Sequence, residues 1–212
     1  MKKYIYILVI SLGFISCIDE DYLEDGGVSS PYVGSDTYTF LKSHSQLDTL
    51  ALLIERADLI DEVNGENTLF APNNLSIQKY VNAVLADMRE EDAEAEFTVN
   101  DIPMDTLQKY MGGYIFPGKI TREDMTMEGE ILTALNGEQK RISLEPREEY
   151  TNQLSSFPEY VFFTYKNGEE WDEWDSIDDD DVVIVRSSNL LSTSGVIHVL
   201  QGTHILFNYD SE

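Results

Sequence analysis

The chain has 212 residues, of which 42% are apolar and 11% aromatic, enough for one domain of ordinary size with a hydrophobic core. It carries 40 acidic and 14 basic side chains, a formal net charge of -26, and a surface of that sign repels polyanions. Nucleic acid is therefore excluded as an expected partner. The apolar residues recur at regular spacings, which excludes a wholly disordered chain.

Residues 1–16 have the pattern of a secretory signal peptide. Lys2 and Lys3 precede an apolar run from Tyr4 to Ile15, and a run of about a dozen apolar residues suits the central region of such a signal. The run is shorter than the roughly 20 residues that a membrane-spanning helix needs. We therefore expect this segment to direct export and then to be removed.

Cys17, the single cysteine of the chain, stands at the end of that run. The sequence Phe14-Ile15-Ser16-Cys17 resembles the lipobox of bacterial lipoproteins, in a version with bulkier side chains than Leu-(Ala/Ser)-(Gly/Ala)-Cys. The resemblance implies that Cys17 becomes the lipidated first residue of the mature protein, with palmitate or a similar acyl chain. The alternative for a lone cysteine is a buried core thiol.

Residues 17–35 are rich in acids, glycine and serine and poor in apolar anchors, which predicts a flexible, solvated tether. Acids directly after a lipidated cysteine resemble the surface-export signal of one large group of Gram-negative bacteria. The resemblance implies an outer-membrane lipid anchor with the protein facing the cell exterior. The alternative is an ordinary acidic linker, which leaves the face of the membrane open.

The first half of the chain predicts three helices and one strand. The first helix follows Ser45 and has apolar residues at helical spacing, with an acid three residues after the serine as in a capping box. A strand at 67–70 precedes a second helix, which Asn73 and Asn74 can cap. The third helix covers about 104–111 and ends at a pair of glycines.

The second half of the chain predicts strands. Asn136-Gly137 and Asn167-Gly168 each lie between extended runs, the pattern of a β-hairpin. The β-branched run 182–185 predicts a strand covered on both sides, and segments 195–200 and 204–207 predict the last two strands. Helices followed by antiparallel hairpins indicate an α+β domain.

Two segments at opposite ends of this domain carry a family resemblance. They are NTLFAPNN (67–74) and SSNLLSTSGVIHVLQGTHILF (187–207), with LTALNG between them. In that order they resemble the fasciclin domain, over about residues 36–208. The resemblance implies N-terminal helices packed on a mostly antiparallel β-sandwich or wedge, surface display, and adhesion or ligand binding without catalysis. The motif residues are Phe70, Ala71, Pro72, Gly195 and His198.

Two of the three histidines, His198 and His204, lie in the second motif. In an extended strand, His198 shares a face with Val196 and Leu200, so apolar neighbours surround it. We therefore expect a buried imidazole, hydrogen-bonded to backbone or to a polar partner, that ties the last strand to the first motif. The orientation of His204 stays open. A zinc site would need about three or four ligands, and His44 is the remaining histidine.

The chain departs from the family pattern in three places, one of which is Ser194, where the family usually has Asn before the second motif's glycine. The Tyr-His pair linked to cell adhesion in animal members is Tyr110-Met111 here, so that receptor contact is not carried over. Residues 145–181 form an insertion that contains Tyr165, Trp171 and Trp174. Exposed tryptophan rings could stack on a sugar or anchor a partner protein, whereas buried ones would belong to the core. These three aromatic side chains are the candidate ligand-binding residues.

Residues 172–181 form an acidic run within the insertion. Carboxylates bind hard cations, which makes calcium a candidate ligand, but the sequence lacks the regular calcium-loop pattern with its turn glycine. The alternative is a solvated acidic edge that discourages pairing between sheets. The sequence predicts no metal site and no cofactor, and it leaves calcium binding by this run open.

Motifs for a nucleophile elbow, a phosphate loop or a zinc protease do not occur in the sequence, which predicts that the chain is not an enzyme. The leading hypothesis is a cell-surface lipoprotein that binds a glycan or a partner envelope protein in support of adhesion or nutrient capture. Family association makes a TonB-dependent transporter a candidate partner. The alternatives are a purely structural envelope protein without a small ligand, and a glycosidase on an unfamiliar scaffold.

Overall fold

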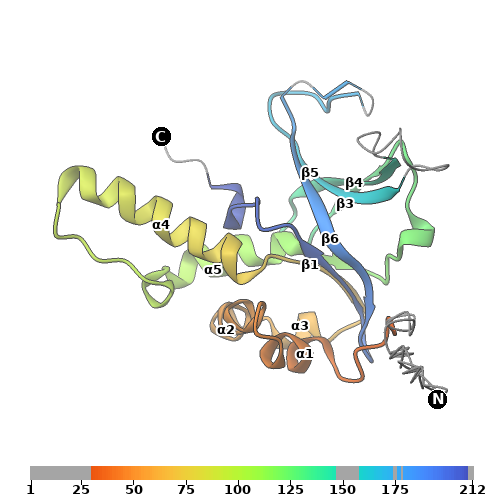
Figure 1. Ribbon diagram of the computed structural model, residues 1–212, viewed down its shortest axis with the longest axis horizontal. Coiled ribbons are helices and arrows are strands. Elements are labelled where there is room, and N and C mark those ends of the chain that lie inside the picture. Colours follow the sequence, from red (N-terminus) through yellow and green to blue (C-terminus); the bar gives the residue numbers. More distant parts are fainter. Residues whose placement is uncertain (1–29, 147–157, 174–175, 178, 210–212) are drawn as a thin grey trace, which may run out of the picture. The chain divides into compact units, whose positions relative to one another are not determined.

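The computed structural model describes residues 30–146, 158–173, 176–177 and 179–209. The signal peptide, Cys17, most of the acidic tether and Trp174 lie outside the described residues. From Pro31 onward the described chain belongs to one unit. Its helices come mainly from the first half of the chain and its strands from the second (Figure 1), as the sequence predicts.

The described strands form one mixed sheet in the order β2-β1-β7-β6-β5-β4-β3. Neighbouring strands are antiparallel, except that β1 pairs in parallel with β7. The backbone N–H of Leu135 donates to the carbonyl of Ile115 at 2.9 Å, so β2 contacts the β3–β4 turn and the two ends of the sheet approach each other. The bounds are β1 Asn67–Ala71, β2 Ile115–Pro117, β3 Glu130–Thr133, β4 Gln139–Pro146, β5 Glu159–Tyr165, β6 Asp181–Leu191 and β7 Val196–Leu200.

The helices supply most of the remaining core. They are α1 Thr37–Ser43, α2 Asp48–Arg56, α3 Ile60–Val63, α4 Asn74–Glu91 and α5 Met104–Tyr110, with short 3-10 turns at Val99–Asp101, Met111–Tyr114, Arg122–Asp124 and Leu206–Asn208. In Figure 1, α1, α2 and α3 lie together on the opposite side of β6 from β3 and β4. Apolar side chains of α2, α4 and α5 join Phe70, Phe116 and Phe163 of the sheet in one buried cluster.

The start of the helical region differs from the prediction in one respect. Asp36 caps an additional helix, α1, by accepting the Thr39 N–H at 2.8 Å. The next helix begins at Asp48 without a side-chain cap, so the predicted capping role of Ser45 is wrong. The other cap is confirmed, because Oδ1 of Asn73 accepts the Ser76 N–H at 3.0 Å at the start of α4.

Three predictions about the strands need correction. The turn at Asn167-Gly168 is not followed by a strand, and β5 pairs instead with β6. Within 182–185, Val183 and Val185 are buried, while on the other face Val182 is exposed and Ile184 half-buried, so only one face is fully covered. The predicted strand 204–207 is a turn that leads into a 3-10 helix, with Phe207 at φ 66°.

The strand β7 accounts for the mixed character of the sheet. It pairs with β6 in antiparallel and with β1 in parallel orientation. This brings the first and second sequence motifs side by side. Among the described residues, none of the helices is both long and apolar enough to span a membrane.

Candidate functional site

The two sequence motifs meet at Phe70 and His198. These residues are partners in the parallel register of β1 and β7, and their rings stack with centroids 4.9 Å apart and an interplanar angle of 19°. The imidazole is 0% exposed. Its Nε2 lies 2.9 Å from the carbonyl oxygen of Ile120, which can only accept, so Nε2 carries the proton and donates.

The glycine of the second motif is required by a close approach of two backbones. A Cβ atom at Gly195 would lie 2.3 Å from the carbonyl oxygen of Asn67, a separation that no side chain tolerates. The Ser192 hydroxyl accepts the Gly195 N–H at 2.8 Å and fixes the turn that leads into β7. In the first motif, Ala71 and Pro72 are buried, and Pro72, which has no N–H to donate, follows the last residue of β1.

The environment of His198 keeps its ring neutral. Burial lowers the pKa of His198 to about 4, against the hydrogen bond to Ile120, which raises it. Nδ1 has no hydrogen-bond partner among the described residues. A neutral ring, stacked on Phe70 and bonded to the segment after β2, links three parts of the fold. This arrangement suits a structural residue and offers no exposed base.

A second buried histidine lies in an aromatic group that the sequence did not reveal. Nε2 of His204 is 2.8 Å from the Tyr114 hydroxyl and 3.4 Å from the Tyr165 hydroxyl. The same Tyr114 hydroxyl accepts the Phe207 N–H at 2.6 Å. Burial lowers the pKa of His204 to about 3 and raises the pKa of Tyr114 and Tyr165. These groups are neutral at physiological pH and hold the end of the chain to the core.

The three candidate ligand-binding aromatics occupy different environments. Tyr165 is buried, with its ring stacked on His204 at 5.6 Å and the Lys140 ammonium 4.4 Å from its centroid. Trp171 is half-buried in the loop after β5. Trp174 lies outside the described residues. Tyr165 therefore presents little ring surface to a ligand, whereas Trp171 retains some.

Trp171 and Tyr165 border one cleft of about 570 Å³ between the β3–β4 turn and the loop after β5. We call it the Trp171 cleft. Besides the two rings, its lining residues are Thr133, Gly137, Glu138, Gln139, Lys140 and Lys166. Polar side chains that surround an aromatic ring can orient a ligand by hydrogen bonds while the ring supplies apolar contact.

Lys140 of β4 lines this cleft and the next residue, Arg141, contacts the Trp171 ring; the sequence interpretation missed both. Lys140 pairs with Tyr165 across β4 and β5 and bonds Glu138 at 2.7 Å. The guanidinium carbon of Arg141 lies 5.8 Å from the centroid of the Trp171 ring, a cation–π contact. The sequence did hold a signal for these residues. Lys140 and Arg141 lie in the strand that follows Asn136-Gly137, and the next strand, β5, is rich in aromatic residues.

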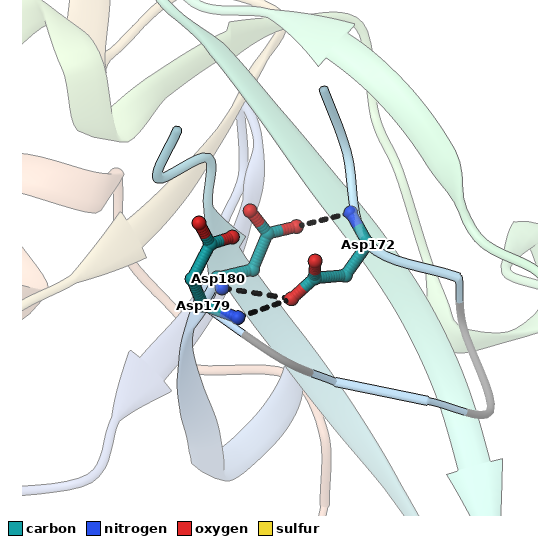
Figure 2. Close-up of side chains that lie close together, drawn as sticks. All are labelled: Asp172, Asp179 and Asp180. Atoms are coloured by element: carbon teal, nitrogen blue, oxygen red, sulfur yellow. Dashed lines mark hydrogen bonds between the residues drawn. The ribbon is translucent and has the colours of Figure 1, made fainter. Parts of the chain in front are cut away.

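Three aspartates of the acidic run, Asp172, Asp179 and Asp180, are linked by hydrogen bonds beside Trp171. Figure 2 shows Oδ2 of Asp172 accepting the N–H groups of Asp179 and Asp180, both at 2.8 Å. In return, Oδ2 of Asp180 accepts the Asp172 N–H at 3.1 Å. Its Oδ1 accepts the Asn167 N–H at 2.9 Å. No strand directly follows Asn167-Gly168 among the described residues, so these carboxylate hydrogen bonds, rather than strand pairing, hold the backbone around Trp171.

This acidic group has the proximity of a metal site but not its composition. Ligand oxygens of Asp172, Asp179 and Asp180 lie within 4.8 Å of one another. However, Arg141 approaches Asp180 at 3.8 Å, so a cation is already present, and the carboxylates accept backbone N–H groups. Calcium takes about six to eight oxygen ligands. Asp180 is buried rather than solvated, so the expectation of a purely solvated edge is wrong for this residue.

Comparison with known proteins identifies the family of this fold. The family model of the fasciclin domain matches residues 45–203. A solved structure of a FAS1 domain pair from the insect cell adhesion molecule fasciclin I is similar, with a TM-score of 0.53 and 13% identity. The match covers 78% of this chain and 49% of that one, so this chain spans about half the length of the pair. At this identity the likeness concerns the fold.

No curated protein matches the chain. The family match covers most of the described domain and includes the first sequence motif and residues 187–203 of the second, and the structure places these motifs side by side on β1 and β7. The chain belongs to the fasciclin domain family, whose domains are typically found in cell adhesion proteins and are generally non-catalytic.

Proposed function

We propose that this chain is a non-catalytic module of the cell surface that binds a glycan, or a glycan-bearing envelope protein, through the Trp171 cleft. The observation that carries the proposal is the position of Trp171. It is a half-buried indole on the border of a cleft of about 570 Å³, held by a cation–π contact with Arg141 rather than packed into the core.

The lining of the Trp171 cleft suits a hydroxyl-rich ligand. Thr133 and Gln139 supply neutral donors and acceptors, while Glu138 and Lys140 supply a bonded pair of opposite charge. Sugars combine apolar ring faces with many hydroxyl groups, so an indole beside mixed polar groups matches their chemistry. Arg141 lies over the Trp171 ring, which restrains the indole before any ligand arrives and lowers the entropy cost of binding.

The proposed location rests on the N-terminal sequence. Lys2, Lys3 and the apolar run to Ile15 support export, and the position of Cys17 supports a lipid anchor in the outer membrane. The acidic tether supports display on the cell exterior. The partner in this setting would be an envelope protein such as a TonB-dependent transporter. The module would capture a ligand in support of nutrient uptake or adhesion.

Binding of oligosaccharides to the full chain tests this proposal. A panel of neutral oligosaccharides is titrated while tryptophan fluorescence is recorded, and hits are measured again by calorimetry. Trp171→Ala should weaken binding on the order of tenfold or more, since stacked aromatic residues dominate such sites. Tyr32→Ala removes an exposed aromatic ring elsewhere and should leave the affinity unchanged.

The alternative is a structural envelope protein without a small ligand. It predicts that the panel gives no fluorescence change and no binding heat, while the protein still associates with other envelope components. Equal affinity of the wild type and Trp171→Ala would also contradict the proposed site, because the ligand would then bind elsewhere.

A further inference from the structure

We propose a second ligand site, separate from the Trp171 cleft, that binds the acidic group of an anionic saccharide such as a uronate or a sulfate ester. The site is a cavity of about 600 Å³ between the start of α4 and the segment that follows β7. We call it the α4 cavity. It is lined by Ser45, Gln46, Asn73, Asn74, Leu75, Lys79, Arg186, Gln201, Gly202 and Thr203.

The charge of the α4 cavity is opposite to that of the protein. Among the described residues, its lining includes two bases, Lys79 and Arg186, and no acid, in a chain with 40 acidic and 14 basic side chains. A concave surface with charge of one sign concentrates ligands of the opposite sign. Because the rest of the surface repels anions, the cavity is a local exception that favours a small anion over a polyanion.

Arg186 is available to a ligand. Among the basic side chains that the structure describes, it alone forms no hydrogen bond, ion pair or ring contact. The position of Arg186 in β6 explains why its side chain has no such partner within the described ranges. Val185 pairs with Leu200 and Ser187 pairs with Val199, so Arg186 is the extra residue of a β-bulge. Bulges redirect a side chain out of the regular alternation of a strand and are frequent beside binding sites.

Lys79 lies one helical turn beyond Leu75 on α4 and is oriented by a single bond to protein. Its Nζ donates to the carbonyl oxygen of Thr203 at 3.2 Å, and an ammonium has three protons to donate. It forms no salt bridge within the described part of the chain. The ammonium is thus held at the cavity wall with donors to spare.

Two backbone N–H groups at the start of α4 already have partners within the protein. The Asn74 N–H donates to Gln46 and the Ser76 N–H donates to the side chain of Asn73. Asn73 is 6% exposed and also donates to the carbonyl of Leu200 at 3.3 Å, which joins α4 to the end of β7. These bonds hold the cavity wall in place, and the side chains of Lys79 and Arg186 supply its positive charge.

The size and the remaining lining indicate a sugar rather than a bare ion. A cavity of about 600 Å³ is far larger than a sulfate or phosphate ion and falls in the range for organic ligands. Gln46, Gln201 and Thr203 supply amide and hydroxyl groups for ligand hydroxyls, and Leu75, 55% exposed, supplies an apolar surface for a ring face. The two cations select a ligand that also carries a carboxylate or sulfate group.

The test is calorimetric titration of the full chain at low and moderate salt with four probes. These are trigalacturonate, a sulfated disaccharide of the chondroitin type, neutral maltotriose, and sodium sulfate. The variants are Arg186→Gln and the double variant Lys79→Gln/Arg186→Gln. The matched control is Lys42→Gln/Lys119→Gln, which makes the same change in net charge at two exposed lysines outside the cavity. Far-UV circular dichroism checks the fold, and Arg186→Gln, which breaks no hydrogen bond or ion pair in the described part of the chain, serves if the double variant unfolds.

We expect at least one acidic saccharide to bind, more tightly than maltotriose and sodium sulfate, and with affinity that falls as salt rises. Arg186→Gln should weaken binding on the order of tenfold, while the control and Trp171→Ala should bind as the wild type does. If the Trp171 cleft proves not to bind a glycan, the result expected for the α4 cavity is therefore unaffected. Absence of binding by both acidic saccharides, equal binding of sulfate alone, or unchanged affinity in Arg186→Gln would overturn the proposal.

Discussion

Phe70 and His198 are joined twice, as register partners on parallel strands and as stacked rings 4.9 Å apart. Phe70 belongs to the first sequence motif and His198 to the second. The pairing of β1 with β7 brings these two distant parts of the chain together. A hydrogen bond from His198 to Ile120 adds the segment after β2. Phe70 and His198 therefore hold together the central strands of this domain, and neither of them lines the Trp171 cleft or the α4 cavity.

The two buried histidines make stability depend on pH. The pKa of His198 is lowered from 6.5 to about 4 and that of His204 to about 3. Below pH 6.5 the unfolded chain binds protons that the folded chain does not, so unfolding takes up protons and the folded state loses stability as pH falls. The stabilisation is complete above pH 6.5 and decreases from there toward the folded pKa values.

We expect the free energy of unfolding to fall by at most about 1.4 kcal/mol per pH unit for each histidine between pH 6.5 and 5. Carboxyl groups such as Asp36 and Asp124, whose pKa values are lowered from 3.8, titrate below this window. Urea unfolding at several pH values measures the slope in the wild type and in His198→Gln. The variant should show about half the wild-type slope. Identical slopes would show that His198 is not buried as a neutral ring.

Gly195→Ala should destabilise the fold strongly. Its new Cβ would lie 2.3 Å from the Asn67 carbonyl oxygen, and since that atom belongs to the backbone of the neighbouring segment, β7 must move away from β1. We expect a loss of about 2–3 kcal/mol or more in denaturant unfolding. Ser194→Ala, one residue earlier, makes a change of similar size without this clash and should cost less than about 1 kcal/mol. Equal stability of the two variants would contradict the described approach.

Asp180→Ala should release the loop that carries Trp171. Asp180 accepts two backbone N–H groups and lies beside the buried guanidinium of Arg141. Removing it leaves that charge without a carboxylate, which costs about 3 kcal/mol or more in comparable buried pairs. The exposed neighbour Asp179 gives the control, and Asp179→Ala should cost much less. Thermal unfolding measures the difference, and a red shift of tryptophan emission reports release of the loop.

Asn73→Ala should weaken the join between α4 and the sheet. Its side chain caps the helix through the Ser76 N–H at 3.0 Å and donates to Leu200 at 3.3 Å. Loss of both bonds predicts a destabilisation of about 1–2 kcal/mol. Asn82→Ala removes an exposed asparagine of the same helix, bonded to Gln78, and should have a small effect. If the two variants unfold at the same denaturant concentration, Asn73 does not act as the cap.

Local patterns predicted those parts of the fold that depend on local chemistry. The asparagine cap of α4, the hairpin at Asn136-Gly137 and the class of the fold all follow from short-range signals. The parallel pairing of β1 with β7 joins segments more than 100 residues apart and has no local signal. Segment 204–207 has the composition of a strand, but its backbone turns at Phe207 to reach the Tyr114 hydroxyl, a tertiary contact that no local pattern contains.

The binding surfaces were predicted only in part. Aromatic composition identified Trp171, but the burial of Tyr165 depends on His204 and Lys140, which come from distant parts of the chain. The α4 cavity was not predicted, because Lys79 and Arg186 are unremarkable in sequence. Arg186 becomes distinctive only through the bulge between β6 and β7, and a bulge depends on the register of two strands.

The most direct test of the central claim combines binding with product analysis on the full chain. Calorimetry with an oligosaccharide that binds the wild type should give a saturable heat that Trp171→Ala loses, and chromatography of the same mixture should recover the oligosaccharide intact. Undiminished binding by Trp171→Ala, or the appearance of shorter saccharides over time, would contradict a non-catalytic module that binds its ligand in the Trp171 cleft.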